Sequence, residues 1–80
     1  MFLYSIYDRV AGLYSCPLFM DNDNVAKRQF PLICQNEPRF KMFPEDLELF
    51  KVGAFDVNSG VITPLARPEH LMKYTEVVNE

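Results

Sequence analysis

Residues 47–63, LELFKVGAFDVNSGVIT, contain the clearest structural signal in this 80-residue sequence. The segment Leu47–Asp56 has the β-branched and aromatic residues of a strand. Its alternate apolar positions, expected on one face, are Phe50, Val52 and Ala54. Turn-forming residues follow and end at Gly60, which is free to adopt a positive φ. We therefore predict a β-hairpin whose second strand is Val61–Thr63.

The hairpin is expected to end at Pro64 and Pro68, because proline cannot donate a hydrogen bond to a strand ladder. The remaining segment, residues 69–80, has weak helical spacing of its apolar residues. It is expected to form either a short terminal helix or an extended arm.

Another strand is predicted at the start of the chain, over Phe2–Asp8. Both of its faces carry apolar side chains, so we expect it to lie centrally in a sheet. The apolar segment Leu13–Met20 is interpreted as a connector, since Pro17 makes it a poor inner strand.

A helix start is indicated by Asp21-Asn22-Asp23-Asn24, because these side chains accept hydrogen bonds from the free amides of a first turn. The helix is predicted over Asn24–Gln35. Its expected buried stripe consists of Ala26, Phe30 and Ile33. Pro31 lies inside the helix and predicts a kink or a split.

The resulting order is strand, helix, strand, strand. The fold class is therefore predicted to be α+β, with one domain spanning residues 1–80. Its expected architecture is a small β-α-β-β domain, a three-stranded antiparallel-type sheet with one helix packed on a face.

The small size of the chain gives it a modest hydrophobic core, so it needs additional stabilisation. Hydrophobic residues make up 49% and aromatic residues 14% of the sequence, a composition that favours self-association into a homo-oligomer. Cys16 and Cys34 are expected to be reduced thiols, with a disulfide between them as the alternative.

No pattern in the sequence indicates catalysis or a bound metal. Only one histidine is present, and neither cysteine has the spacing of a zinc ligand pair. Paired carboxylates such as Glu45-Asp46 lie at turns and helix starts, where capping explains them. We expect a binding protein that is not an enzyme and that has no cofactor.

The chain carries no targeting segment and no apolar run of membrane-spanning length, which predicts a cytoplasmic protein. Its net charge of −3 disfavours general nucleic-acid coating, which depends on many Lys and Arg residues.

A local basic patch remains a candidate for binding nucleic acid. Lys27 and Arg28 lie on the predicted helix, off its buried stripe, and Arg39, Phe40 and Lys41 follow in the next loop. Two basic residues can pair with phosphates while an aromatic residue between them stacks a base. The alternative is a solvated loop with Phe40 tucked into the core. A further candidate is an aromatic platform on the sheet, with core packing as its alternative; its residues are Phe2, Tyr4, Tyr7 and Tyr14.

Three segments together resemble the non-structural protein of gokushoviruses (Microviridae), small tailless phages with single-stranded DNA. The segments are the opening FLYSIYD (2–8), the helix start NDNVAKRQF (22–30), and FPEDLELFKVGAFD (43–56) followed by Gly60. Phe43 stands where that family usually has histidine, and Pro31 interrupts its helix.

This resemblance implies a phage non-structural accessory protein in the host cytoplasm. It implies a role in the switch to single-stranded genome synthesis or packaging, through binding of single-stranded DNA or of a phage or host replication protein. The alternative function is a homo-oligomeric protein-interaction module that binds a host or phage protein without nucleic acid.

Overall fold

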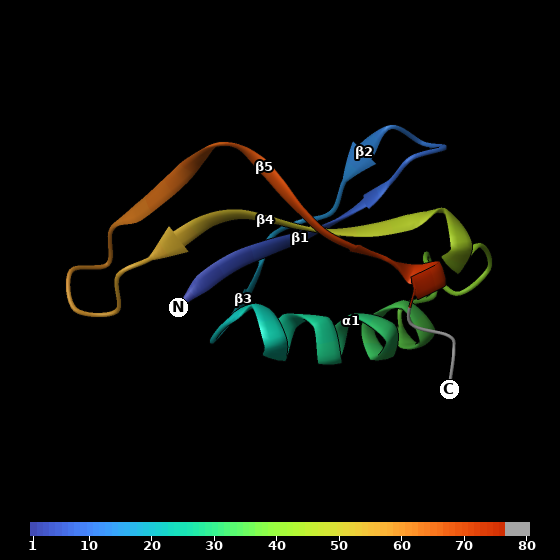
Figure 1. Cartoon of the computed structure of the whole chain (residues 1–80), viewed down its shortest axis with the longest axis horizontal. Coiled ribbons are helices and arrows are strands. Elements are labelled where there is room, and N and C mark those ends of the chain that lie inside the picture. The colour runs from blue at the N-terminus through green and yellow to red at the C-terminus, as the bar shows by residue number, and fades with distance from the viewer. Residues whose placement is uncertain (77–80) are drawn as a thin grey trace.

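One curled antiparallel sheet and one helix make up most of the computed structural model, which describes residues 1–76 (Figure 1). The elements are β1 (Phe2–Asp8), β2 (Leu13–Tyr14), β3 (Leu18–Met20), α1 (Asp23–Asn36), the 3-10 helix η1 (Pro44–Asp46), β4 (Leu47–Phe55), β5 (Ile62–Lys73) and the 3-10 helix η2 (Tyr74–Glu76). The sheet order is β2-β1-β4-β5, and β3 pairs with β1 on the same side as β2. Helix α1 lies against one face of this sheet.

The predicted three-stranded β-α-β-β architecture is therefore wrong: the sheet has five strands and is curled into a half-barrel. The missed strands lie in the segment interpreted as a connector. The carboxylate of Asp8 accepts hydrogen bonds from the amides of Val10 (3.0 Å) and Ala11 (3.1 Å). Gly12 completes the turn with φ of 73°. This turn reverses the chain and returns it along β1.

Pro17 is accommodated because it lies between two short edge strands. Ser15 bridges this break: its amide donates to the Ile6 carbonyl (2.8 Å), and its Oγ accepts from the Ile6 amide (2.9 Å). The Ser5 hydroxyl also donates to the Ser15 carbonyl (2.8 Å). The backbone groups of Ile6 at the break in β-pairing are thereby hydrogen-bonded. A proline is tolerated at this edge.

The predicted hairpin is confirmed, with Phe55 opposite Ile62 and Gly60 at φ of 77°. Its second strand does not end at the prolines, however, but continues as β5 to Lys73. Both prolines lie in an edge strand, where a missing N–H interrupts no inner ladder. The predicted terminal helix or arm is thus a paired strand over Glu69–Lys73 followed by η2, and residues 77–80 lie outside the described residues.

The expected alternation along β4 is interrupted by a β-bulge. Lys51 pairs with Tyr4 and Gly53 pairs with Leu3, which leaves Val52 as the additional residue. Side chains beyond the bulge therefore change face. For this reason the prediction that Phe50 and Ala54 share one face is wrong.

Helix α1 agrees with its predicted span to within one residue at each end, and Asn22 caps it by accepting from the Val25 amide (2.9 Å). Pro31 does not split the helix. Ala26 and Phe30 are buried as predicted, while Cys34 rather than Ile33 completes the buried stripe. The core between the helix and the sheet consists of Tyr4, Ile6, Ala26, Phe30, Cys34, Leu47 and Leu49.

Candidate nucleic-acid interface

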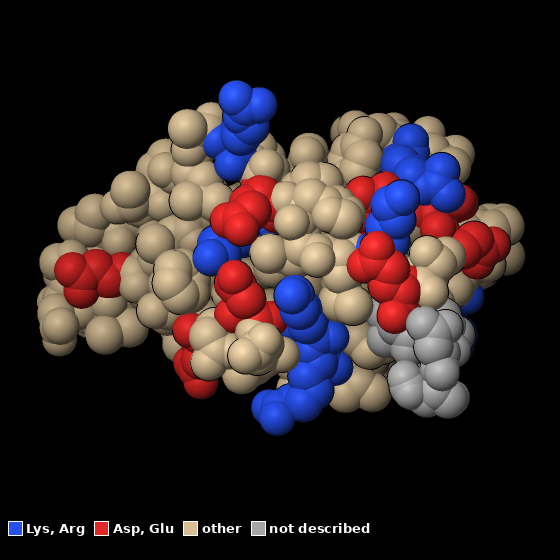
Figure 2. Space-filling view, in the orientation of Figure 1, with Lys and Arg blue, Asp and Glu red and all other residues tan. Residues whose placement is uncertain are grey.

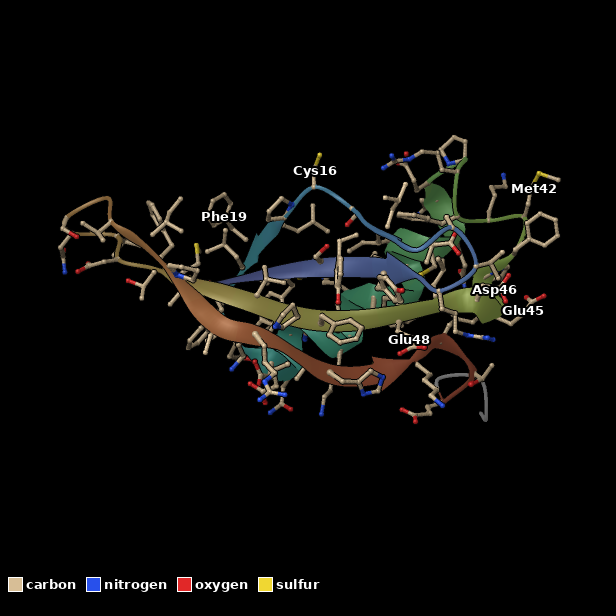
Figure 3. All side chains as sticks on the ribbon, turned by 90° about the horizontal axis from the view of Figure 1, so that it is seen from above. Cys16, Phe19, Met42, Glu45, Asp46 and Glu48 are labelled. Atoms are coloured by element: carbon tan, nitrogen blue, oxygen red, sulfur yellow. The ribbon has the colours of Figure 1, made fainter. Side chains whose placement is uncertain are left out.

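The sheet face away from α1, here called the open face, carries an aromatic cluster. Ile6 and Leu49 pack toward the helix, so their chain neighbours Tyr7 and Phe50 point the other way. Strand pairing places Tyr14 beside Tyr7 and His70 beside Phe50. We define the aromatic cluster as Tyr7, Tyr14, Phe50 and His70. Figure 3 looks down on this face of the sheet.

The rings of the cluster are in direct contact. Ring centroids lie 4.6 Å apart for Tyr7 and Tyr14, 5.5 Å for Tyr14 and Phe50, and 5.2 Å for Phe50 and His70. The last two pairs are edge-to-face, which is a favourable aromatic geometry. Tyr14 remains 48% exposed and the His70 side chain 40% exposed. The cluster therefore presents aromatic surface to solvent while its inner members hold it in place.

A second aromatic pair lies on the open face, at the other end of β1. Phe19 on β3 and Phe55 at the end of β4 have centroids 5.3 Å apart. Phe19 pairs with Leu3, four residues before Tyr7 along β1. Four strand residues span about 13 Å. The open face thus offers two aromatic sites separated by about that distance.

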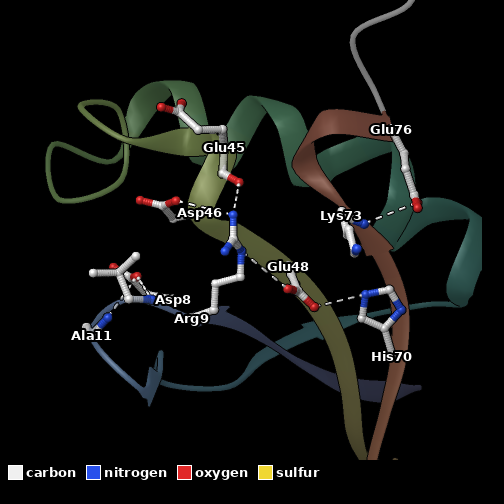
Figure 4. A network of polar contacts seen from close by, with 10 residues as sticks. Asp8, Arg9, Ala11, Glu45, Asp46, Glu48, His70, Lys73 and Glu76 are labelled. Carbon is white, nitrogen blue, oxygen red and sulfur yellow. Dashed lines mark hydrogen bonds and ion pairs between the residues drawn. The ribbon is translucent and has the colours of Figure 1, made fainter.

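Charged groups border the aromatic cluster at the end of β1 (Figure 4). Glu48 lies opposite Tyr7 and contacts both His70 Nε2 (3.1 Å) and Arg9 Nε (3.8 Å). Arg9 also contacts Asp46 (3.4 Å) and remains half exposed. Lys73 follows on β5, opposite Glu48. The cationic groups nearest to the cluster are therefore partly compensated by carboxylates.

Charges on the face of the molecule drawn in Figure 2 are interleaved rather than concentrated. On the face shown in Figure 2, the described basic and acidic side chains alternate over the helix and the sheet. This distribution agrees with the net charge of −3. The described residues on this face therefore allow local phosphate contacts but provide no extended cationic track.

The basic loop (residues 39–41) differs from the predicted nucleic-acid site in the position of its aromatic ring. Phe40 is half-buried and packs against the core, as the alternative interpretation had it. Arg39 lies 5.2 Å from the Phe40 ring centroid and pairs with Glu37 (3.3 Å). Lys41 is exposed. The Phe40 ring is therefore covered on one side by Arg39 and on another by the core.

The two basic residues on α1 are exposed but lie apart from this loop. Lys27 and Arg28 follow the buried Ala26 by one and two positions, or about 100° and 200° around the helix. Asn36, the end of α1, lies nine positions after Lys27, which corresponds to about 14 Å along the helix. The helix pair and the loop pair therefore do not form a compact cluster. Their role in nucleic-acid binding stays a prediction.

The aromatic platform predicted from the sequence, Phe2, Tyr4, Tyr7 and Tyr14, is divided between the two faces of the sheet. Phe2 and Tyr4 belong to the helix side of the sheet, whereas Tyr7 and Tyr14 lie on the open face. Strand alternation over Phe2–Asp8 separates Tyr4 from Tyr7. The contributions of Phe50 and His70 depend on the pairing of β4 with β5, which was predicted to end before His70.

The two cysteines are free thiols, Cys34 buried and Cys16 exposed, which confirms the prediction of reduced cysteines. Burial raises the pKa of the Cys34 thiol to about 12. Among residues 1–76, no group of three or more His, Cys, Asp or Glu side chains is arranged to hold a metal ion. Within the same residues, α1 is too short and too polar to cross a membrane, and no other helix is longer.

Comparison with known proteins gives one match. Neither the curated proteins nor the solved structures contain a match to this chain. A protein-family model described as "Phage ORF5 protein" matches residues 1–77, nearly the whole sequence. The chain therefore belongs to the Phage ORF5 protein family, a family of bacteriophage proteins.

Proposed function

We propose that this phage protein is an accessory protein that binds single-stranded DNA through its open face during the switch to single-stranded genome synthesis or packaging. The observation that carries this proposal is the aromatic cluster, which exposes Tyr14 and His70 on either side of the inner residues Tyr7 and Phe50. Single-strand binding proteins stack successive bases on such side chains. The protein acts by occupancy, without turnover.

The choice of single-stranded DNA rests on chemistry and on the resemblance described above. Bases in a single strand are free to stack on an exposed ring, whereas bases in a duplex are already stacked. Gokushoviruses, which this sequence resembles, have single-stranded genomes. A replication protein of the phage or host is the other partner that this role implies.

The expected binding mode is dominated by stacking, with few phosphate contacts. Arg9 and Lys73 are the cations beside the cluster, and Arg9 is partly compensated by Asp46 and Glu48. Each single-strand phosphate contact contributes a slope of about −0.7 to the dependence of log affinity on log salt. We therefore expect a total slope between about −1 and −2.

A fluorescence anisotropy titration with a dye-labelled oligo-dT tests this proposal. Stacking on an aromatic side chain contributes about 1–3 kcal/mol per base, so Tyr14→Ala is expected to weaken binding about tenfold or more. Phe43→Ala is the matched control, because Phe43 is also an exposed aromatic (61%) but lies in the loop before η1. It should bind as the unaltered protein does.

The second candidate function is a homo-oligomeric module that binds a host or phage protein without nucleic acid. The net charge of −3 and the number of large exposed apolar side chains favour it. If the unaltered protein does not bind oligo-dT even at low salt, the single-stranded DNA proposal is wrong and this candidate replaces it.

A further inference from the structure

The two edges of the sheet differ in how they are protected. Edge strands of soluble proteins are usually blocked by charges or prolines, because their free backbone groups would otherwise pair with another chain. The β5 edge has both kinds of protection: Pro64, Arg67, Pro68, Glu69 and Lys73. The opposite edge, Val10–Met20, contains no charged residue, and its one proline precedes β3.

The backbone of Phe19 in β3 is turned toward this unprotected edge. Ile6 exchanges hydrogen bonds with Ser15, so the even-numbered residues of β1 direct their backbone groups toward β2 and β3. Phe2 and Tyr4 thus hydrogen-bond β3, while Leu3, which lies opposite Phe19, does not. The N–H and C=O of Phe19 accordingly point away from β1.

Apolar side chains line the same edge and are substantially exposed. The exposed fractions are 75% for Val10, 69% for Leu13, 48% for Tyr14, 36% for Leu18 and 50% for Phe19. Met1, which lines the same hollow as Leu18 and Phe19, is 45% exposed. Exposed apolar side chains of this kind are typical of the core of a protein–protein interface.

We propose that a second copy of this chain binds here, with β3 pairing antiparallel to β3 of the partner subunit about a two-fold axis at Phe19. Antiparallel pairing of identical strands is self-complementary, and the absence of charge from Val10 to Met20 avoids like-charge contacts across the axis. A chain whose described core has eight buried hydrophobic residues gains stability from such an interface.

This arrangement has a consequence for the open face. An axis perpendicular to the sheet directs the open faces of both copies to the same side. Tyr14 lies on the β2 edge, so the aromatic clusters of the two copies flank the axis on one continuous surface. The dimer itself does not depend on what the open face binds.

Sedimentation velocity over about 1 µM to 1 mM, a range that covers moderate interface affinities, tests the proposal with a matched pair of variants. Phe19→Lys places a charge on the unprotected edge, and Ile62→Lys places one at a residue of similar exposure (54%) on the β5 edge. The unaltered protein and Ile62→Lys should form dimers of equal affinity. Phe19→Lys should weaken dimerisation at least tenfold while keeping the far-ultraviolet circular dichroism of the fold.

Hydrogen exchange provides a second measurement that requires no variant. The Phe19 amide should become more protected as protein concentration rises, since it gains a partner only in the dimer. The Ile62 amide also points outward, because Phe55 opposite it donates to Met1, and its protection should not depend on concentration. A monomer at about 1 mM, a concentration above most specific dissociation constants, would overturn the proposal. So would concentration-independent exchange at Phe19, or a greater loss of dimer in Ile62→Lys than in Phe19→Lys.

Discussion

The hydroxyl of Tyr4 donates a 2.7 Å hydrogen bond to the Asp23 carboxylate and thereby joins the central strand of the sheet to the first turn of α1. Tyr4 is completely buried, and Lys51 contacts the same carboxylate oxygen (3.2 Å). Burial and the bond to Asp23 raise the pKa of the Tyr4 hydroxyl. The phenol therefore stays protonated and remains a donor.

Tyr4→Phe should lower the free energy of unfolding, because it removes a buried donor to a charged acceptor without leaving a large cavity. The expected loss is about 1–2 kcal/mol, measured by urea denaturation. Tyr14→Phe on the exposed edge is the control and should change stability by less than about 0.5 kcal/mol. Equal effects of the two variants would mean that the Tyr4–Asp23 bond does not stabilise the helix–sheet contact.

Acid should destabilise the protein partly through Asp23. Desolvation tends to raise the pKa of this carboxyl, but the hydrogen bonds from Tyr4 and Lys51 and the charges of Lys51 and Lys27 outweigh it, so the pKa lies below 3.8. A folded-state pKa below the unfolded value contributes stability above the unfolded pKa, and this contribution is lost as pH falls through the folded pKa.

Asp23→Asn should therefore flatten the loss of stability between about pH 5 and pH 2, where the native carboxylate becomes protonated. Urea denaturation at several pH values measures the slope. The slope for Asp23→Asn is compared with the slope for Asp56→Asn. The Asp56 carboxylate accepts from the Asn58 amide in the exposed hairpin loop, and its pKa is also lowered. An unchanged slope in Asp23→Asn would show that Asp23 is not a determinant of acid stability.

The two thiols should differ strongly in reactivity. A thiolate is the reactive form, and burial holds the pKa of Cys34 at about 12. A thiol reagent at neutral pH should modify the exposed Cys16 rapidly and Cys34 only after unfolding. Mass spectrometry of the native protein counts the modified sites, and rapid modification of both would contradict the buried position of Cys34.

Pro31→Ala should stabilise the protein. Proline in the ninth position of α1 cannot donate to the carbonyl four residues before it, and its ring crowds the preceding turn. Alanine restores the donor and has the highest helix propensity, so we expect a gain of about 1–3 kcal/mol in the free energy of unfolding. Thermal or urea denaturation measures the change, and a loss of stability would indicate that the Pro31 ring is needed for packing.

The elements predicted correctly are those whose sequence signals lie within a few neighbouring residues. The first strand, the helix with its Asn22 cap and the turn at Gly60 belong to this group. Each depends on hydrogen bonds or dihedral preferences of neighbouring residues. The helix bounds were accordingly correct to within one residue.

The features that were missed depend on contacts between distant segments or on position in the sheet. Pro17 lies between two edge strands and Pro64 lies within one, and a single sequence does not reveal which strand is at an edge. The bulge at Val52 reverses the faces of β4 and depends on pairing with β1. The aromatic cluster joins four segments in this way, so the sequence suggested Tyr7 and Tyr14 for an aromatic platform but not Phe50 and His70.

Binding of single-stranded DNA by the open face can be mapped residue by residue. Two-dimensional ¹H–¹⁵N NMR of the labelled protein, titrated with a short oligo-dT, reports binding at every backbone amide. The largest changes in chemical shift should fall on Tyr7, Tyr14, Phe50 and His70. Changes confined to the helix and loop residues Lys27, Arg28, Arg39, Phe40 and Lys41, or no changes at all, would contradict binding by the open face.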